Sequence, residues 1–442
     1  MKNIKLAYLL LIAGLTALWL LADNILSIPY DFFAYRASLI NYSGIIGIGV
    51  MSIGMILAMR PAALEPVLGG LDKGYRLHKW LGITGLVASV LHWLLANGPK
   101  WMIGWGWMER PQRGPRVEQT NAVFAFLDSQ RHLAESVGEW AFYGAVVLMV
   151  LALVKWFPYR YFFKTHRILA IAYLALVAHA VVLMKFTYWG EIIGPLMAVL
   201  MAAGSVGAVI SLTRKVGSRR KAHGTIEALE YHAENRVLKV AVKLDGRWAG
   251  HKAGQFAFVT FDPAEGPHPF TISSAWQGDG KLFFLIKGIG DYTRQLPDSL
   301  KVGDSVNVEG PYGRFEFESD KPGQIWVAGG IGITPFIARM QSLIGKPDAP
   351  AIDLFYSTSA PDKGFIERIR QIADAARIRL HVLVADKDGR LNAERIRQQV
   401  PDWKRSDVWF CGPAGFGSAL RRDFASSGLS ADDFHQELFD MR

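Results

Sequence analysis

The sequence predicts a multi-domain membrane protein, with a six-helix all-α transmembrane domain, an antiparallel β-barrel and a doubly wound α/β domain. Apolar runs, each close to the ~20 residues that cross a bilayer, are confined to the first half. Short alternating strands separated by Gly and Pro begin near His223. After Pro322, buried strands alternate with helical stretches. We therefore expect domains over residues 1–217, 218–320 and 321–442.

The 442 residues are 51% hydrophobic, which is a high fraction for a soluble protein. The excess lies before about residue 213, in runs near residues 6–22, 43–59, 80–96, 140–157, 168–184 and 192–212. The first run is not interpreted as a cleaved signal, because no small-residue cleavage site follows it and further spans come after it. All six runs are predicted to be transmembrane helices.

Basic residues flank these spans mainly on one side of the membrane. They are Lys2, Lys5, Arg60, Lys73, Arg76, Lys79, Lys155, Arg160, Lys164, Arg167, Arg214, Lys215, Arg219, Arg220 and Lys221. Because cytoplasmic loops are rich in Lys and Arg, we expect a multi-pass protein of the inner cell membrane with its soluble half in the cytoplasm. We attribute the net charge of +10 to basic residues that set the membrane topology and contact anionic lipid. Nucleic-acid binding is not expected, since these charges form no stripe on a soluble face.

Four histidines lie in two of the predicted spans, His78 with His92 and His166 with His179. An imidazole in hydrocarbon is costly, so two pairs at similar spacings indicate a shared function. The helical rise places the members of the pairs roughly 21 Å and 20 Å apart. Two such helices could hold two stacked haems, one on His78 and His166 and the other on His92 and His179, leaving no open axial position.

The angular spacing of these histidines is less regular. At ~100° per residue the first pair lies on nearly one face, but the second pair is about 140° apart, so its helix would need a bend, a bulge or an off-centre haem. Each histidine alone could be a core or interfacial residue bonded to backbone. The single cysteine, Cys411, excludes an internal disulfide and a four-cysteine iron–sulfur cluster, so flavin and haem would have to carry electrons.

Three motifs mark the soluble half. His268-Pro-Phe-Thr-Ile-Ser-Ser274 follows a strand and can place an aromatic ring and hydroxyls around a flat ligand. Lys287-Gly-Ile-Gly-Asp-Tyr-Thr293 suits phosphate binding, although an ordinary glycine turn has the same pattern. Val327-Ala-Gly-Gly-Ile-Gly-Ile-Thr-Pro-Phe336 runs from strand into helix, where glycines and a helix N-terminus can receive a pyrophosphate.

A fourth segment, Phe410-Cys-Gly-Pro-Ala414, ends the last predicted strand, where ligands bind in open parallel sheets. Cys411 could pack beside a nicotinamide, and its alternative is inert core packing.

With these residues identified, the chain resembles the ferric reductase and NADPH oxidase superfamily over almost all of its length. The membrane half is similar to the family's haem domain, whose third and fifth helices carry paired histidines, and the soluble half is similar to the ferredoxin-reductase module. The resemblance implies FAD binding by His268, Phe270, Thr271, Ser273, Ser274, Lys287, Gly290, Tyr292 and Thr293. It implies binding of NADH or NADPH by Gly329, Gly330, Gly332, Thr334, Pro335, Cys411, Gly412 and Pro413.

Two positions depart from the family pattern. Members often have an arginine after the second strand of the nucleotide domain, suited to the 2′-phosphate of NADPH, whereas Tyr356-Ser-Thr-Ser359 offers only hydroxyls. The choice between NADH and NADPH is therefore open. Many members end in an aromatic residue that covers the flavin, but here Phe439 precedes Asp440-Met-Arg442 and is a candidate for the cover or for core packing.

The predicted function is an oxidoreductase in which cytosolic NADH or NADPH reduces FAD and two b-type haems carry single electrons to an acceptor beyond the membrane. Molecular oxygen, ferric chelates and a periplasmic protein are all candidate acceptors. One alternative is a membrane-anchored flavin reductase without haems that passes electrons to a protein partner or a quinone. Another is a transporter or channel whose soluble half senses the nucleotide.

Overall fold

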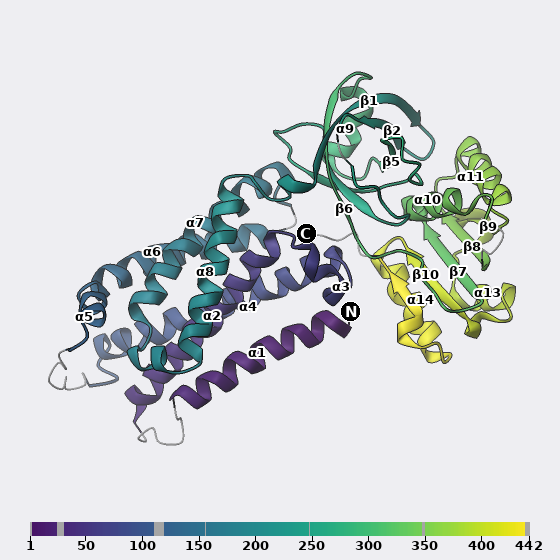
Figure 1. Ribbon diagram of the computed structural model, residues 1–442. Helices are drawn as coiled ribbons and strands as arrows, with labels where there is room; N and C mark the ends of the chain where they lie inside the picture. The colour runs from purple at the N-terminus through teal and green to yellow at the C-terminus, as the bar shows by residue number, and fades with distance from the viewer. Residues whose placement is uncertain are drawn as a thin grey trace. The chain divides into compact units, whose positions relative to one another are not determined.

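The computed structural model describes residues 2–23, 31–109, 119–154, 156–246, 248–346 and 350–437. These residues form two compact units, and along the chain the boundary lies between Val216 and Gly217. Figure 1 labels the helices of the first unit, α1 to α8, and most strands of the second, among them β1, β6, β7 and β10.

Within the described residues, six helices are long and apolar enough to cross a membrane, which confirms the predicted helical domain. They are α1 (Lys2–Asp23), α2 (Phe32–Ala58), α4 (Leu71–Gly104), α6 (Arg131–Leu153), α7 (Tyr159–Leu183) and α8 (Ile193–Leu212). Short helices lie between them at α3 (Glu65–Leu68), α5 (Ala122–Ser129) and the 3-10 turns Ala62–Leu64 and Phe186–Gly190.

Small residues let α2 and α8 approach each other closely. A Cβ atom on Gly207 would lie 2.8 Å from the carbonyl oxygen of Met55, and one on Gly204 would lie 3.0 Å from the Cα of Ser52. The Ser52 hydroxyl also bonds the Tyr173 hydroxyl of α7 at 2.8 Å. Close backbone contact and interhelical hydrogen bonds are the forces that hold helices together in lipid, where the hydrophobic effect between helices is absent.

The first sheet of the second unit has six antiparallel strands among the described residues, in the order β4-β3-β6-β1-β2-β5. The strands are β1 (Lys221–His232), β2 (Val237–Leu244), β3 (Phe256–Thr260), β4 (His268–Thr271), β5 (Lys281–Lys287) and β6 (Ser305–Tyr312), with α9 (Asp291–Ser299) between the last two. The edges β4 and β5 meet at one bridge, between Ile272 and Phe284. The fold is therefore the predicted antiparallel barrel, with an isolated bridge between the two edges of its sheet in the described residues.

The second sheet is parallel and has five strands in the described part of the chain, ordered β11-β10-β7-β8-β9. Its elements are β7 (Gly323–Gly329), α10 (Thr334–Leu343), β8 (Ala351–Thr358), α11 (Lys363–Ala375), β9 (Arg379–Val384), α12 (Ala385–Asp388), α13 (Ala393–Gln399), β10 (Ser406–Cys411), α14 (Ala414–Ser426) and β11 (Phe434–Gln436). The chain runs outward from β7 to β9 and then returns to the other side of β7. This reversal makes the sheet doubly wound, as predicted, with its switch point between β7 and β10.

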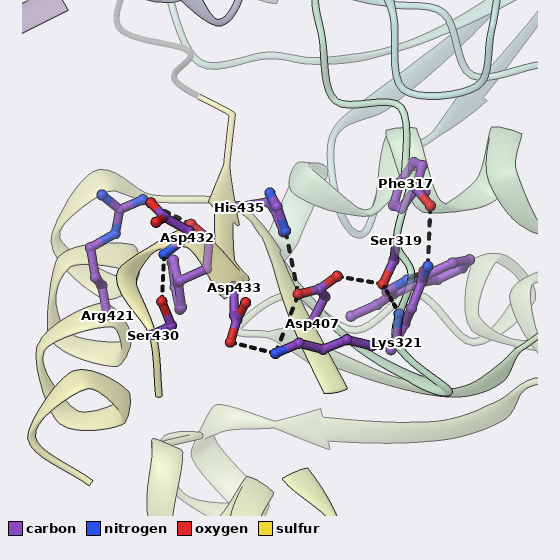
Figure 2. A network of polar contacts seen from close by, with 12 residues as sticks. Phe317, Ser319, Lys321, Asp407, Arg421, Ser430, Asp432, Asp433 and His435 are labelled. Atoms are coloured by element: carbon purple, nitrogen blue, oxygen red, sulfur yellow. Dashed lines mark hydrogen bonds and ion pairs between the residues drawn. The ribbon is translucent and has the colours of Figure 1, made fainter. Parts of the chain in front are cut away.

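A polar network holds the last strand against β10 (Figure 2). The carboxylate of Asp407, at the start of β10, lies 3.8 Å from Lys321 Nζ and 3.6 Å from His435 Nε2. Lys321 also pairs with Asp433, just before β11. The imidazole of His435 stacks on Trp409 with ring centres 4.0 Å apart. This network fixes the strand that leads to Glu437.

Candidate functional site

The four histidines of the membrane unit meet as two pairs across α4 and α7. The ring centres of His78 and His166 are 5.9 Å apart with planes at 68°. Those of His92 and His179 are 6.2 Å apart with planes at 78°. These are the partners that the sequence spacing predicts.

Backbone carbonyls of neighbouring helices orient three of these rings. His78 Nδ1 lies 3.0 Å from the oxygen of Gly54, His92 Nδ1 lies 3.0 Å from that of Ile40, and His179 Nδ1 lies 2.8 Å from that of Ala134. A carbonyl oxygen only accepts hydrogen bonds, so each Nδ1 carries the proton and each Nε2 keeps a lone pair. The rings are therefore in the tautomer that binds a metal through Nε2.

Of the bend, bulge or off-centre haem expected for the second histidine-bearing helix, a bulge is not observed. The described helix α7 is an unbroken α-helix from Tyr159 to Leu183. Its His179 faces α6 and lies directly over Gly138. His179 therefore lies in a gap between the side chains of α6, and the helical hydrogen bonding of α7 is intact.

The His-Pro-Phe-Thr motif forms the edge strand β4 of the barrel. The imidazole of His268 stacks on the ring of Tyr292 from α9, with centres 4.6 Å apart and planes at 24°. Burial lowers the pKa of His268 to about 4, so the ring is neutral at physiological pH. The ring of Phe270 is also stacked with that of His268, at 6.3 Å between ring centres and 19° between planes. The two predicted flavin motifs therefore meet in one aromatic stack.

The predicted flavin hydroxyls have different surroundings. The hydroxyl oxygen of Thr271 is buried and has no hydrogen-bond partner within the described structure. Ser273 Oγ accepts from Leu285 N at 3.3 Å and Ser274 Oγ accepts from Phe283 N at 3.2 Å, so both help to close the barrel. Thr293 Oγ1 accepts from Gly290 N at 3.0 Å and caps α9. Thr271 therefore offers a buried hydroxyl that still needs a hydrogen-bond partner.

The glycine string and the Cys-Gly-Pro segment meet at the switch point of the parallel sheet. A Cβ atom on Gly329 would lie 2.7 Å from Cδ of Pro413, and one on Gly332 would overlap the carbonyl oxygen of Cys411. Gly330 has φ +55°, a conformation suited to glycine. Thr334 and Pro335 open α10 directly after the string. Only glycines allow this contact between the ends of β7 and β10.

Lys287 reaches the nucleotide domain. It lines a pocket with Gly330, Ile331, Ile333, Tyr356, Thr358, Phe365, Asn235 and Val237. A Cβ atom on Gly330 would lie 3.9 Å from Lys287 Nζ. Among the described residues that line the pocket, Lys287 is the one basic side chain. Lys287 therefore lies beside the glycine string of the nucleotide domain, although the resemblance assigned it to FAD binding.

Of the two predicted catalytic residues, Cys411 and Phe439, the structure describes Cys411. Cys411 is fully buried, and burial raises the pKa of its thiol well above the usual range. Its sulfur lies 4.0 Å from Oε2 of Glu437, an acid that sequence reasoning missed and that is also buried. Phe439 lies outside the described residues.

The models of two protein families match successive parts of the chain. The ferric reductase-like transmembrane component matches residues 43–177, which include both histidine pairs. An FAD-binding domain matches residues 224–316, which include the His-Pro-Phe-Thr strand and α9. The chain therefore joins a ferric reductase-like transmembrane component to an FAD-binding domain. It is a multi-pass membrane protein that carries an FAD module.

Curated relatives of this ferric reductase-type chain match only parts of it. It is 28% identical over 210 residues to the NADPH oxidoreductase of Mycobacterium tuberculosis (strain ATCC 25618 / H37Rv), covering 46% of this chain and 51% of the relative. It is 25% identical over 162 residues to a flavohemoprotein of Oceanobacillus iheyensis, covering 34% and 40%. It is 27% identical over 196 residues to the toluate 1,2-dioxygenase electron transfer component of Pseudomonas putida, covering 42% and 58%. The chain spans about half the length of the curated relatives it matches.

Proposed function

We propose that this protein is an NAD(P)H-dependent membrane oxidoreductase that passes electrons from a cytosolic nicotinamide through FAD and two b-type haems to an acceptor beyond the membrane. The observation that carries the proposal is the pairing of His78 with His166 and of His92 with His179.

The spacing of the paired rings fits a metal ion between them. Two imidazoles on opposite sides of one ion, at about 2.0–2.1 Å from metal to nitrogen, place their ring centres about 6 Å apart. The observed separations are 5.9 and 6.2 Å. In three of the rings the N–H of Nδ1 donates a hydrogen bond to a backbone carbonyl. This is the usual environment of a metal-binding imidazole.

His78 and His166 would hold the inner haem, and His92 and His179 the outer haem. A bound haem with two imidazole ligands supplies one-electron transfer. Because each iron would be held by an imidazole from both helices, the acceptor would have to react without binding the iron. This leaves a small molecule such as oxygen or a ferric chelate as the proposed acceptor class.

The soluble unit supplies the two-electron side of the reaction. The aromatic stack around His268 and the free hydroxyl of Thr271 suit a flavin. The glycines at the switch point suit a pyrophosphate, with Lys287 as its counter-charge and Cys411 as a neutral wall beside the nicotinamide. A flavin is needed because a nicotinamide gives up two electrons at once and a haem accepts one.

The topology supports a cytosolic position for this chemistry. With six successive spans, α8 ends on the side of the membrane on which α4 and α7 begin, near His78 and His166. The basic residues that flank the spans cluster on the same side, which is cytoplasmic by the positive-inside rule. The reductase half would therefore feed the inner haem.

A haem spectrum and an anaerobic reduction of the purified protein test the proposal. We expect two b-type haems and one FAD per chain, with reduction of both haems by NADH or NADPH in the absence of oxygen. Separate addition of oxygen and a ferric chelate then identifies the acceptor by the rate of haem reoxidation. A protein with FAD but no haem would instead support the membrane-anchored flavin reductase.

A further inference from the structure

The side chain of His179 is oriented by a gap in the neighbouring helix α6. Its position on α7 is about 140° around the helix from His166, so the two imidazoles leave α7 in different directions. A Cβ atom built on Gly138 would lie 2.5 Å from Cε1 of His179 and nearer still to its Nδ1. The imidazole therefore occupies the space that any other residue at 138 would fill.

The same gap exposes a hydrogen-bond acceptor. In an α-helix the carbonyl of residue 134 accepts from the N–H of residue 138, so the Ala134 oxygen lies next to Gly138. A carbonyl oxygen has two lone pairs and can accept a second bond. His179 Nδ1 takes this second position at 2.8 Å.

The partner ring follows the same pattern on α2 with more space. His92 Nδ1 bonds the carbonyl of Ile40, and the residue four positions later is Gly44. A Cβ atom on Gly44 would lie 3.5 Å from Cε1 of His92, an ordinary contact. Steric exclusion of a side chain is therefore strict at Gly138 and relaxed at Gly44.

We propose that Gly138 is a positioning residue for the outer haem: its missing side chain lets His179 donate its Nδ1 proton to the Ala134 carbonyl, and this bond sets the reduction potential of that haem. This inference rests on the proposed function. A hydrogen bond from the second ring nitrogen makes an imidazole a stronger donor to a metal. A stronger donor stabilises the ferric state and lowers the potential, so loss of the bond raises it.

The experiment compares Gly138→Ala with Gly144→Ala in the full chain. Both substitutions lie on α6, but a Cβ atom on Gly144 would meet nothing within 4 Å. Redox titration of each purified protein, followed in the α band, gives the potentials of the two haems. In Gly138→Ala we expect the outer haem to shift at least tenfold towards the ferrous state, or about 59 mV more positive for one electron, with the inner haem unchanged. Gly144→Ala should match the wild type.

Loss of the outer haem alone from Gly138→Ala would also support the inference, because His179 would then be displaced within an otherwise assembled protein. An unshifted outer potential in a two-haem Gly138→Ala protein would overturn it. If this variant does not accumulate, pulsed EPR of the wild-type protein with ¹⁵N-histidine decides: a proton coupling typical of hydrogen-bonded Nδ1 supports the bond, and that of a free N–H overturns it. Wild-type protein without haem would overturn the proposed function as well. An unshifted potential in a two-haem variant would overturn only the role of Gly138.

Discussion

The guanidinium of Arg36 donates to the carbonyl oxygen of Leu95 at 2.7 Å, which joins α2 to the last third of α4. This carbonyl is available because the residue four positions later is Pro99, which has no N–H and leaves the helical bond unmade. A second donor of Arg36 reaches the carbonyl of Ala96 at 3.0 Å. An arginine on α2 thus satisfies the backbone of α4 one turn beyond His92.

We expect Arg36→Leu to destabilise the membrane unit by about 1–3 kcal/mol, because it leaves the Leu95 carbonyl without a donor in a low-dielectric environment. Thermal unfolding of the detergent-solubilised full chain, followed by haem absorbance, would measure this as a lower melting temperature. Lys100→Leu is the control, since the one described hydrogen bond of its amine is an exposed contact with Asn97 Oδ1 at 3.1 Å. Equal melting temperatures for the two variants would contradict the assignment.

Double substitutions at the histidines test the pairing across the two helices. We expect His78→Ala/His166→Ala to lose one of the two haems and His78→Ala/His179→Ala to lose both, because each haem needs one ligand from each helix. A pyridine haemochrome assay gives the haem content per FAD. His132→Ala on α6 is the control and should keep both haems. Retention of one haem by the cross-pair variant would mean that the ligands are paired differently.

Much of the fold could be predicted from periodicity, and the exceptions have local causes. The six spans and the strands with regular alternation lie where the sequence places them. Strand β1 begins where the strands are expected to start, near His223, but its register shifts between Ile226 and Ala228, which breaks the alternation after its first half. Strand β4 was missed because it coincides with the His-Pro-Phe-Thr motif, whose proline is tolerated on an edge strand.

The candidate site could be predicted in its side chains but not in its backbone. The histidine spacings indicate their own partners, because helix geometry is regular. The carbonyls of Ile40, Gly54 and Ala134 carry no signal, since every residue has a carbonyl. For the carbonyls of Ile40 and Ala134, the sequence sign is a glycine four residues later, Gly44 or Gly138. Glu437 was missed because only the short strand β11 brings it to Cys411.

Lys287 offers a test of which cofactor its amine serves. We expect Lys287→Met to raise the KM for the nicotinamide nucleotide roughly tenfold or more, because a charge-assisted bond to a phosphate contributes about 1.5–3 kcal/mol. The FAD content should not change. Lys281→Met, at the other end of β5, removes a similar charge that pairs with Glu227 at 3.0 Å and is the control. Loss of FAD with an unchanged KM would assign Lys287 to the flavin.

An acidic residue after β8 predicts a preference for NADH over NADPH. The carboxylate of Asp362 accepts from Phe365 N at 2.8 Å beside the pocket wall formed by Phe365 and Thr358. Nearby Arg368 is engaged with Glu230 at 2.9 Å. An acidic group at this edge repels a 2′-phosphate and suits a ribose diol.

We therefore expect a higher kcat/KM with NADH than with NADPH. Asp362→Asn should lower the ratio of kcat/KM with NADH to kcat/KM with NADPH roughly tenfold, which corresponds to about 1.4 kcal/mol. Asparagine caps a helix as well as aspartate does, so α11 stays intact. Asp374→Asn, at the far end of α11, should leave the ratio unchanged. A preference for NADPH in the wild type would contradict this interpretation.

The thiol of Cys411 should resist alkylation in the folded protein. Burial is the main cause of its raised pKa, and the carboxylate of Glu437 adds to it, so the unreactive neutral form persists at pH 8. Because the chain has one cysteine, mass spectrometry after iodoacetamide treatment reports on this site alone. We expect no modification of the native protein and full modification after denaturation. Rapid labelling of the native protein would show an accessible thiolate and would rule out a passive, neutral wall beside the nicotinamide.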